Sequence, residues 1–89
     1  METQQEYREG VTTLENLIEY LVKALVDEPD LVEIKEVPQE EATTYEVRVA
    51  PNDLGKVIGK QGRIANALRT VAKAAAMKNK RKVYVEIIA

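Results

Sequence analysis

Two glycines three residues apart, Gly59 and Gly62, place the strongest constraint on how this chain can fold. Glycine adopts backbone conformations that a Cβ obstructs, so a pair at this spacing predicts a tight turn and lets another backbone approach closely. Branched apolar residues flank the turn and can anchor it to a core: Val57, Ile58, Ile64 and Leu68. The polar residues of the turn then stay exposed, which predicts a rigidly held, positively charged loop.

A helix is predicted to begin at Arg63, directly after this turn. The first amide hydrogens of a helix have no partner within it, and the helix dipole adds partial positive charge there, so the position suits a phosphate group. Glycine pairs also occur in ordinary connections between helices. The spacing alone therefore leaves an ordinary turn as the alternative.

The residues around the turn, VIGKQGRI at 57–64 within DLGKVIGKQGRIANAL at 53–68, resemble the signature of the KH domain, an RNA-binding module. That signature is an apolar pair, Gly, two variable residues and Gly, then a helix with further apolar residues. The longer run is similar to the small bacterial single-KH proteins of the KhpA type, over roughly residues 13–88. One position departs from many KH domains, because Ala65 stands where a branched apolar residue is common.

Hydrophobic periodicity predicts the elements on either side of the turn. Apolar residues at three- and four-residue spacing predict a helix over residues 13–26 with one apolar face: Leu14, Leu17, Ile18, Leu21 and Leu25. The remaining elements, in chain order, are two strands that form an antiparallel hairpin, a short helix, a longer helix and a last strand: 31–37, 44–49, 52–58, 63–77 and 83–88.

This pattern predicts one small domain of the α+β class, with two layers. The resemblance adds the topology, a type II KH fold with the order α-β-β-α-α-β and a three-stranded sheet covered on one face by helices. Residues 13–89 would form this single KH domain. Residues 1–12 carry little periodic apolar content and are predicted to be a flexible extension.

Periodicity also predicts which side chains face inward. In the helix over 63–77 these are Ile64, Leu68, Val71 and Ala75, with Ala67 and Ala72 beside them. Asn66, Arg69 and Lys73 fall on the opposite side. The many alanines of this helix predict close packing against the sheet or another helix. In the strand over 44–49, the inward residues are Tyr45, Val47 and Val49.

Charge is distributed unevenly along the chain. Residues 1–53 hold fourteen acidic and four basic residues, a net charge of −10, whereas residues 54–89 hold one acidic and nine basic residues, a net charge of +8. Such asymmetry indicates one surface for a polyanion, although the net charge of the whole chain is −2. The alternative is that both sets solvate the surface and pair with each other.

Several classes of function are disfavoured. The chain has no cysteine, so we expect no disulfide and no thiolate metal site, and no histidine, the commonest general base and metal ligand. The only acids near the basic region are Asp53 and Glu86, so we expect no catalytic residue, metal site or cofactor. The spacing from Gly55 to Gly59 has three residues where a phosphate-binding P-loop needs four, and Gln61 follows Lys60 where that loop needs Ser or Thr. No apolar run is long enough to span a membrane, and the acidic start is unlike a signal peptide, so a cytoplasmic protein is expected.

The resemblance implies binding of about four unpaired nucleotides of single-stranded RNA. The loop from Gly59 to Gly62, called here the glycine loop, would contact the RNA backbone. The predicted RNA-binding residues are Lys56, Val57, Ile58, Gly59, Lys60, Gln61, Gly62, Arg63 and Arg69. Ala65, Leu68 and Val47 or Val49 would help form the groove floor. No aromatic residue is expected near the loop, which predicts weak stacking and weak sequence preference.

The resemblance also implies partners and a role. It implies a homodimer, or a heterodimer with a larger KH-containing RNA-binding protein, and a post-transcriptional regulatory or RNA chaperone role. The alternative function is a protein-interaction or dimerisation module in which the fold is mainly an assembly scaffold. In that case enlarging Val22 or Ala74 should remove a partner, whereas replacing Lys60 and Gln61 should remove RNA.

Overall fold

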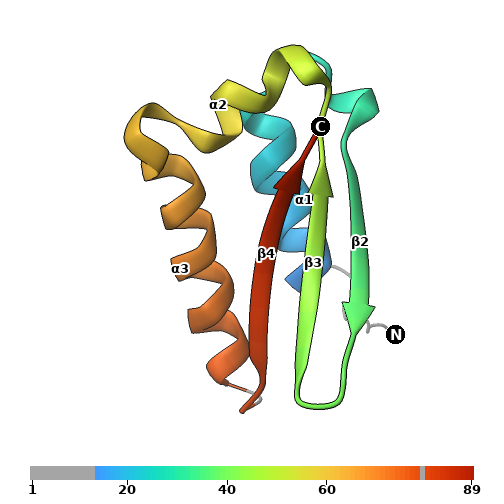
Figure 1. The fold of residues 1–89 in the computed structure, drawn as a ribbon, viewed down its shortest axis with the longest axis vertical. Coiled ribbons are helices and arrows are strands. Elements are labelled where there is room, and N and C mark those ends of the chain that lie inside the picture. Colours follow the sequence, from blue (N-terminus) through green and yellow to red (C-terminus); the bar gives the residue numbers. More distant parts are fainter. Residues whose placement is uncertain (1–13, 79) are drawn as a thin grey trace, which may run out of the picture.

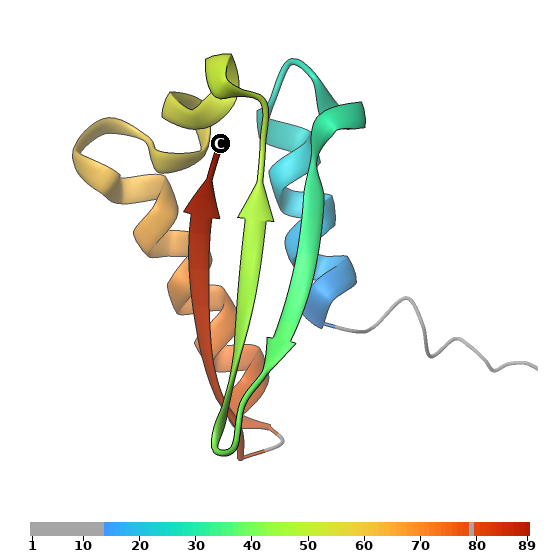
Figure 2. The ribbon, with the colours of Figure 1, turned by 45° about the vertical axis from the view of Figure 1, so that its right-hand side comes forward.

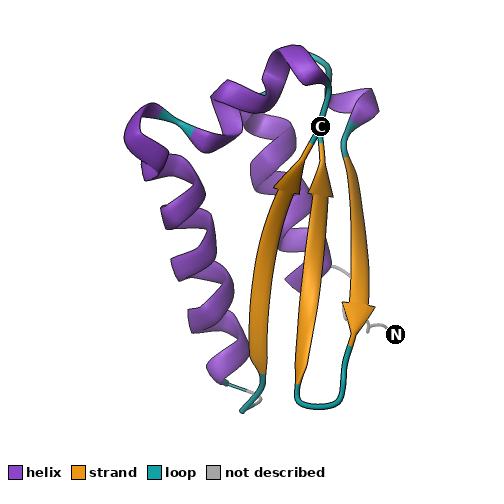
Figure 3. Ribbon diagram, viewed as in Figure 1, coloured by secondary structure: helices purple, strands orange, loops and turns teal. Residues whose placement is uncertain are grey.

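The computed structural model describes residues 14–78 and 80–89, which form helices and one sheet in the predicted order (Figures 1 and 3). The longer elements are α1 Leu14–Leu25, β2 Glu33–Pro38, β3 Ala42–Arg48, α2 Leu54–Ile58, α3 Arg63–Met77 and β4 Lys82–Ile88. Single 3₁₀ turns lie at Pro29–Leu31, Pro51–Asp53 and Lys60–Gly62. The predicted α+β class is confirmed. The predicted extension over residues 1–12 lies outside the described residues.

The sheet has the strand order β2-β3-β4. β2 and β3 pair antiparallel, from Glu33 opposite Arg48 to Pro38 opposite Thr43, so the predicted hairpin is confirmed. β3 and β4 pair in parallel, in register from Ala42 opposite Lys82. Parallel neighbours need a long crossover connection, and here α2, the glycine loop and α3 provide it. β4 is therefore the edge strand on the side of α3.

Both long helices cover the same face of the sheet, α1 beside β2 and α3 beside β4, and Figure 2 shows the strands in front of them. Alternate side chains of the strands point to the helices and form the core. They include Tyr45, Val47, Val83 and Val85, each 7% exposed or less. The inward face predicted for the strand over 44–49 is confirmed, since Tyr45, Val47 and Val49 are all buried.

The buried face of α1 is narrower than the sequence predicted. Ile18 and Val22 are at most 2% exposed, so Val22 packs in the core. Leu17 and Leu25 were expected on the inward face, but each is 36% exposed. Leu17 flanks the buried stripe and Leu25 is the last residue of the helix. A single helix on a sheet buries only one stripe of its surface, so residues at the flank and the end stay partly in water.

The inward face of α3 is rotated from the predicted one. The buried residues are Ala65, Leu68, Ala72 and Ala76, whereas Val71 is 42% exposed and Ala67 is exposed. The expectation for Val71 is therefore wrong. Small side chains let the helix approach the sheet closely, so alanines and not the bulkier Val71 set this face. The predicted close packing of the alanine-rich helix is confirmed.

Proline changes two predicted boundaries. The strand expected from residue 31 begins at Glu33, because Pro29 opens a 3₁₀ turn that ends at Leu31. The helix expected over 52–58 begins as a 3₁₀ turn at Pro51 and becomes α-helical at Leu54. Proline suits the first position of such turns because its missing N–H would be unpaired there.

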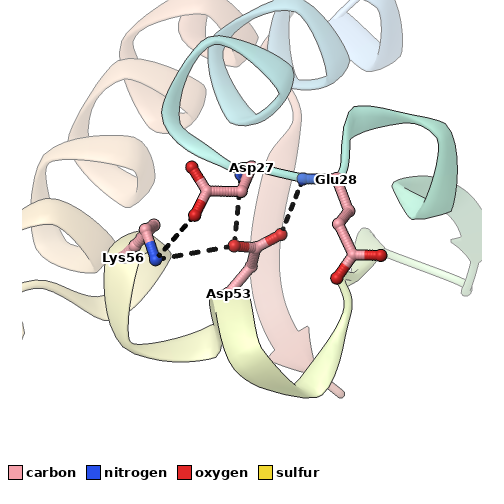
Figure 4. Close-up of polar contacts among 4 residues, drawn as sticks. All are labelled: Asp27, Glu28, Asp53 and Lys56. Carbon is pink, nitrogen blue, oxygen red and sulfur yellow. Dashed lines mark hydrogen bonds and ion pairs between the residues drawn. The ribbon is translucent and has the colours of Figure 1, made fainter.

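One buried carboxylate joins the segment after α1 to the start of α2 (Figure 4). Asp53 is 1% exposed, and its two oxygens accept hydrogen bonds from the backbone N–H groups of Asp27, at 3.1 Å, and Glu28, at 3.0 Å. Lys56 Nζ lies 3.3 Å from an Asp27 carboxylate oxygen and 3.7 Å from one of Asp53. Asp53 directly precedes α2, but its side chain makes no capping hydrogen bond to that helix. It fastens α2 to a segment 25 residues away in sequence.

Replacing Asp53 by Asn should lower the free energy of unfolding by about 1–3 kcal/mol, because the amide NH₂ group cannot accept the hydrogen bond that a carboxylate oxygen accepts. Denaturant unfolding measures the change. Asp30→Asn is the matched control, since Asp30 is exposed on the same connection. Equal stability of Asp53→Asn and wild type would contradict the fastening role.

Candidate nucleic-acid interface

The predicted tight turn is present between α2 and α3. Gly59 and Gly62 have φ values of +79° and +75°, and Gln61 between them has φ +57°. The N–H of Gly62 donates to Gly59 O at 3.1 Å, and the N–H of Arg63 donates to Lys60 O. A positive φ at three of four positions turns the chain from one helix directly into the next.

The two glycines meet different requirements. A Cβ on Gly59 would lie 2.7 Å from Ile64 Cγ1 and 2.9 Å from the Ile64 backbone N, which is closer than atoms can pack. A Cβ on Gly62 would meet nothing within 4 Å. Gly59 is therefore required for close approach to α3 and for its positive φ, whereas Gly62 is required for its φ alone.

The polar side chains of the turn are exposed, as predicted. Lys60 and Gln61 both face solvent, and the Arg63 guanidinium donates to Gln61 Oε1 at 3.1 Å. This bond orients Gln61 and leaves its NH₂ group to donate. The resemblance to KH domains implies that the backbone amides from Lys60 to Arg63 lie along the RNA phosphates. Those of Gly62 and Arg63 donate within the turn, while those of Lys60 and Gln61 have no acceptor in the described part of the chain.

The residues before and after the turn hold it to the core. Val57 is fully buried, Leu68 is 6% exposed, and Ile58 and Ile64 are half-buried. Val57 was predicted to bind RNA, but its side chain offers no surface to a ligand and supports the loop from below. Ile58 keeps an exposed part that can line a groove.

Two predicted cations have partners within the protein. Lys56 makes the ion pairs with Asp27 and Asp53 described above, so its charge is partly balanced. Arg69 lies on α3, where its Nε donates to Val85 O on β4 at 3.4 Å and its Nη1 donates to Asn66 Oδ1 at 3.3 Å. Arg69 therefore spans from α3 to the edge strand.

The strand beside α3 is β4. Val47 or Val49, from the strand over 44–49, was instead predicted to help form the groove floor. Val47 and Val49 are at most 3% exposed, and β3 is the central strand, so neither valine can line an open groove. Between α3 and β4 lies a hollow of about 80 Å³ lined by Arg69, Lys73, Val83, Tyr84 and Val85. The parallel crossover moves the groove one strand outward.

Sequence reasoning assigned no role to two residues of this hollow, Lys73 and Tyr84. Residues 66, 69 and 73 are spaced to lie on one side of the helix, and this spacing was visible in the sequence. The spacing does not predict which strand these residues face. A helix that connects parallel strands packs against the strand it leads to, and that rule would have placed β4 there.

The described residues offer no group of three or more His, Cys, Asp or Glu side chains that could hold a metal ion. None of the helices in the described part of the chain is long and apolar enough to cross a membrane. Lys60, Arg63 and Lys73 make no ion pair with the described residues, and no acidic residue occurs between Asp53 and Glu86 in the sequence. The loop and the groove thus present uncompensated positive charge.

Comparison with known proteins gives consistent matches. The family model described as KhpA/KhpB, KH domain, matches residues 15–87. A protein named RNA-binding protein KhpA from Caldanaerobacter subterraneus subsp. tengcongensis is 57% identical over 72 residues, which cover 81% of this chain and 96% of that protein. Its namesake from Clostridium perfringens is 56% identical over 75 residues, 84% of this chain and 100% of that protein.

A solved structure shows the same fold at low sequence identity. A crystal structure of Aquifex aeolicus Era bound to GDP·AlF₄⁻ superposes with a TM-score of 0.62 and 19% identity. The match covers 83% of this chain and 29% of that chain. At this identity the likeness concerns the fold alone.

Substituting the two glycines separately tests the geometry of the loop. Gly62→Ala should lower the free energy of unfolding by roughly 1–2 kcal/mol, the cost of a left-handed backbone for a residue with a Cβ. Gly59→Ala should lower it by more, because the added Cβ also meets Ile64. Thermal or denaturant unfolding of both variants measures the difference. A Gly59→Ala protein as stable as Gly62→Ala would contradict the close approach.

Proposed function

The chain belongs to the KhpA/KhpB family of KH domains, and from this premise we propose that it binds single-stranded RNA through the glycine loop and the groove between α3 and β4. Membership of the family confirms the resemblance read from the sequence and the type II KH fold. It also confirms the expectation that the protein is not an enzyme, because KH RNA-binding proteins of this kind are non-enzymatic.

The observation that carries the proposal is a rigid loop with exposed donors and uncompensated charge beside an open groove. Phosphate oxygens would accept from the backbone amides of Lys60 and Gln61, from the Lys60 ammonium and from the Gln61 NH₂ group. Arg63 would add charge while it holds Gln61 in place. Because the turn is fixed by its own hydrogen bonds, little conformational entropy would be lost on binding.

The bases would turn toward β4. An edge strand presents N–H and C=O groups that no neighbouring strand pairs, and these can bond to base edges. Arg69 already bonds to one such group, the carbonyl of Val85. The loop would hold about four unpaired nucleotides, the number typical of this loop. Contacts to backbone phosphates carry no sequence information, so sequence preference would be weak at the loop.

The wider role is also a proposal. A small RNA-binding protein with weak sequence preference suits a post-transcriptional regulatory or RNA chaperone role in the bacterial cytoplasm. A single domain that contacts few phosphates binds weakly, and a second copy or a larger KH-containing RNA-binding partner would raise avidity.

A protein-interaction function is the second candidate, because the helices expose apolar side chains. Tyr20 on α1 is 73% exposed and Val71 on α3 is 42% exposed. Ala74, three residues after Val71, is also exposed, so enlarging it still tests a partner contact. Val22 no longer serves that test, because it is fully buried and a larger residue there would disturb the core.

Reversing the charge of the loop should remove RNA binding without unfolding the protein. For the variant with Lys60→Asp and Gln61→Asp, we expect a loss of at least about tenfold in affinity for a short unstructured RNA. In the wild type, with three or four phosphates contacted, log K should fall with log salt with a slope of roughly −2 to −3. Fluorescence anisotropy at several salt concentrations measures both quantities.

The matched control carries the same substitutions at Lys35 and Gln39, which are exposed on and after β2, away from the loop. This control should bind RNA with nearly the affinity of the wild type. Thermal unfolding checks that both variants fold. Equal binding by wild type and loop variant, or no binding by the wild type, would overturn the proposed function.

A further inference from the structure

A second and larger hollow lies at the other end of α3 from the glycine loop. Its volume is about 320 Å³, and it is lined by Lys73, Met77, Arg81, Lys82, Val83 and Tyr84. It shares Lys73, Val83 and Tyr84 with the smaller hollow beside Arg69. In Figures 1 and 2, the end of α3 and the start of β4 lie side by side at the end of the domain opposite the glycine loop. The two hollows therefore follow each other along the same groove.

The lining of this hollow combines an aromatic ring, a thioether and several cations. Tyr84 is 54% exposed and Met77 is 73% exposed. Single exposed apolar residues are ordinary on protein surfaces. Here the two share one hollow with Lys73, Arg81 and Lys82, and no acidic side chain lines it. On the open face of the sheet, Tyr84 also borders a hollow that Glu46 and Glu86 line, so the positive charge lies on the α3 side of the ring. A flat apolar surface beside positive charge suits a ligand with a planar ring and a phosphate, which is the chemistry of a nucleotide.

The walls of the hollow are held in place. The Arg81 guanidinium donates to the buried hydroxyl of Thr43 on β3, and the backbone N–H of Arg81 donates to Ala76 O at 3.2 Å. These bonds fasten the connection after α3 to both the sheet and the helix. Val83 and Val85 are buried toward the helices on either side of Tyr84, so the backbone that carries the ring is fixed. The ring itself starts from the face of β4 that the helices leave open, at the sheet edge where Lys82 also lies.

The hollow lies well along the groove from the loop. Met77 follows Arg63 by fourteen residues on one helix, which corresponds to about 21 Å along the helix axis. In the proposed function, the glycine loop binds the RNA backbone at the start of α3. A strand that leaves the loop along α3 would therefore reach Tyr84 with nucleotides beyond the about four that the loop holds.

We propose that this larger hollow binds one further unpaired nucleotide of the same RNA strand. The side chains that would bind it are Lys73, Met77, Lys82 and Tyr84, and we call them the Tyr84 pocket. The base of this nucleotide stacks on the Tyr84 ring beside Met77, and its phosphate is held by Lys73 and Lys82. The inference rests on the proposed function, because it places RNA in the groove. It also revises the sequence expectation of weak stacking, since β4 brings an aromatic ring to the groove at a distance from the loop.

The test compares oligonucleotides of four and eight unstructured nucleotides. The wild type should bind the longer one more tightly, and Tyr84→Ala should reduce this gain in affinity on lengthening the RNA from four to eight nucleotides by about five- to thirtyfold. Tyr84→Phe keeps the ring and should bind as the wild type does. Tyr20→Ala, which removes another exposed tyrosine on α1, should have no effect.

Two further readouts separate stacking from a general loss of charge. A 2-aminopurine placed at either end of the longer RNA should be quenched by the wild type at one end, and Tyr84→Ala should abolish that quenching. Lys73→Ala should make the salt slope for the longer RNA shallower by about 0.7, the value for one phosphate on a single strand. Lys35→Ala, an exposed lysine on β2, is its control.

The outcomes distinguish this inference from the proposed function. If the loop variant loses all RNA binding but Tyr84→Ala binds both oligonucleotides as the wild type does, the Tyr84 pocket is overturned and the proposed function stands. If the wild type binds neither oligonucleotide, both are overturned. Unfolding curves of Tyr84→Ala and Tyr84→Phe must overlay that of the wild type for the comparison to count.

Discussion

The parallel pairing of β3 with β4 determines where the candidate interface lies. Parallel strands cannot be joined by a tight turn, so the chain must leave the sheet after β3 and return beside it. The whole of that return path consists of α2, the glycine loop and α3. The pairing therefore fixes both ends of the segment that carries the loop. It also places the last strand beside α3, with one backbone edge open toward the helix.

Two contacts hold the connection from β3 to β4 in a fixed position. Asp53 fastens the start of α2 to the connection after α1 through two backbone hydrogen bonds. Gly59 lets the turn close against Ile64, which itself packs on the core. Hydrogen bonds to a buried carboxylate act at the start of α2, and a close backbone approach acts at its end. The orientation of this five-residue helix, too short to be stable alone, thus depends on its neighbours.

Much of the fold could be predicted from the sequence, because its periodicities are strong. The limits of α3 and the antiparallel hairpin followed from the spacing of apolar residues. The inward face of α3 did not, because hydrophobicity ranks Val71 above alanine, whereas close packing on the sheet favours the smaller residue. The glycine turn was predictable from two residues. Its hydrogen bonds were not, since they depend on the φ of Gln61, a residue that rarely adopts a left-handed backbone. The strand that lines the groove was predicted to be the one over 44–49, but it is β4. Lys73 and Tyr84, which line the hollow beside β4, were therefore given no role.

The open edge of β4 has a second consequence, which concerns other copies of the protein. An unpaired strand edge is a template on which another sheet can add a strand, and many proteins aggregate by that route. Here Arg69 covers the carbonyl of Val85, and Lys73 and Lys82 stand along the same edge. A second copy arriving edge to edge would bring these cations against their own counterparts, and like charges repel. The positive charge that would draw in RNA therefore also disfavours pairing of β4 with β4 of a second copy.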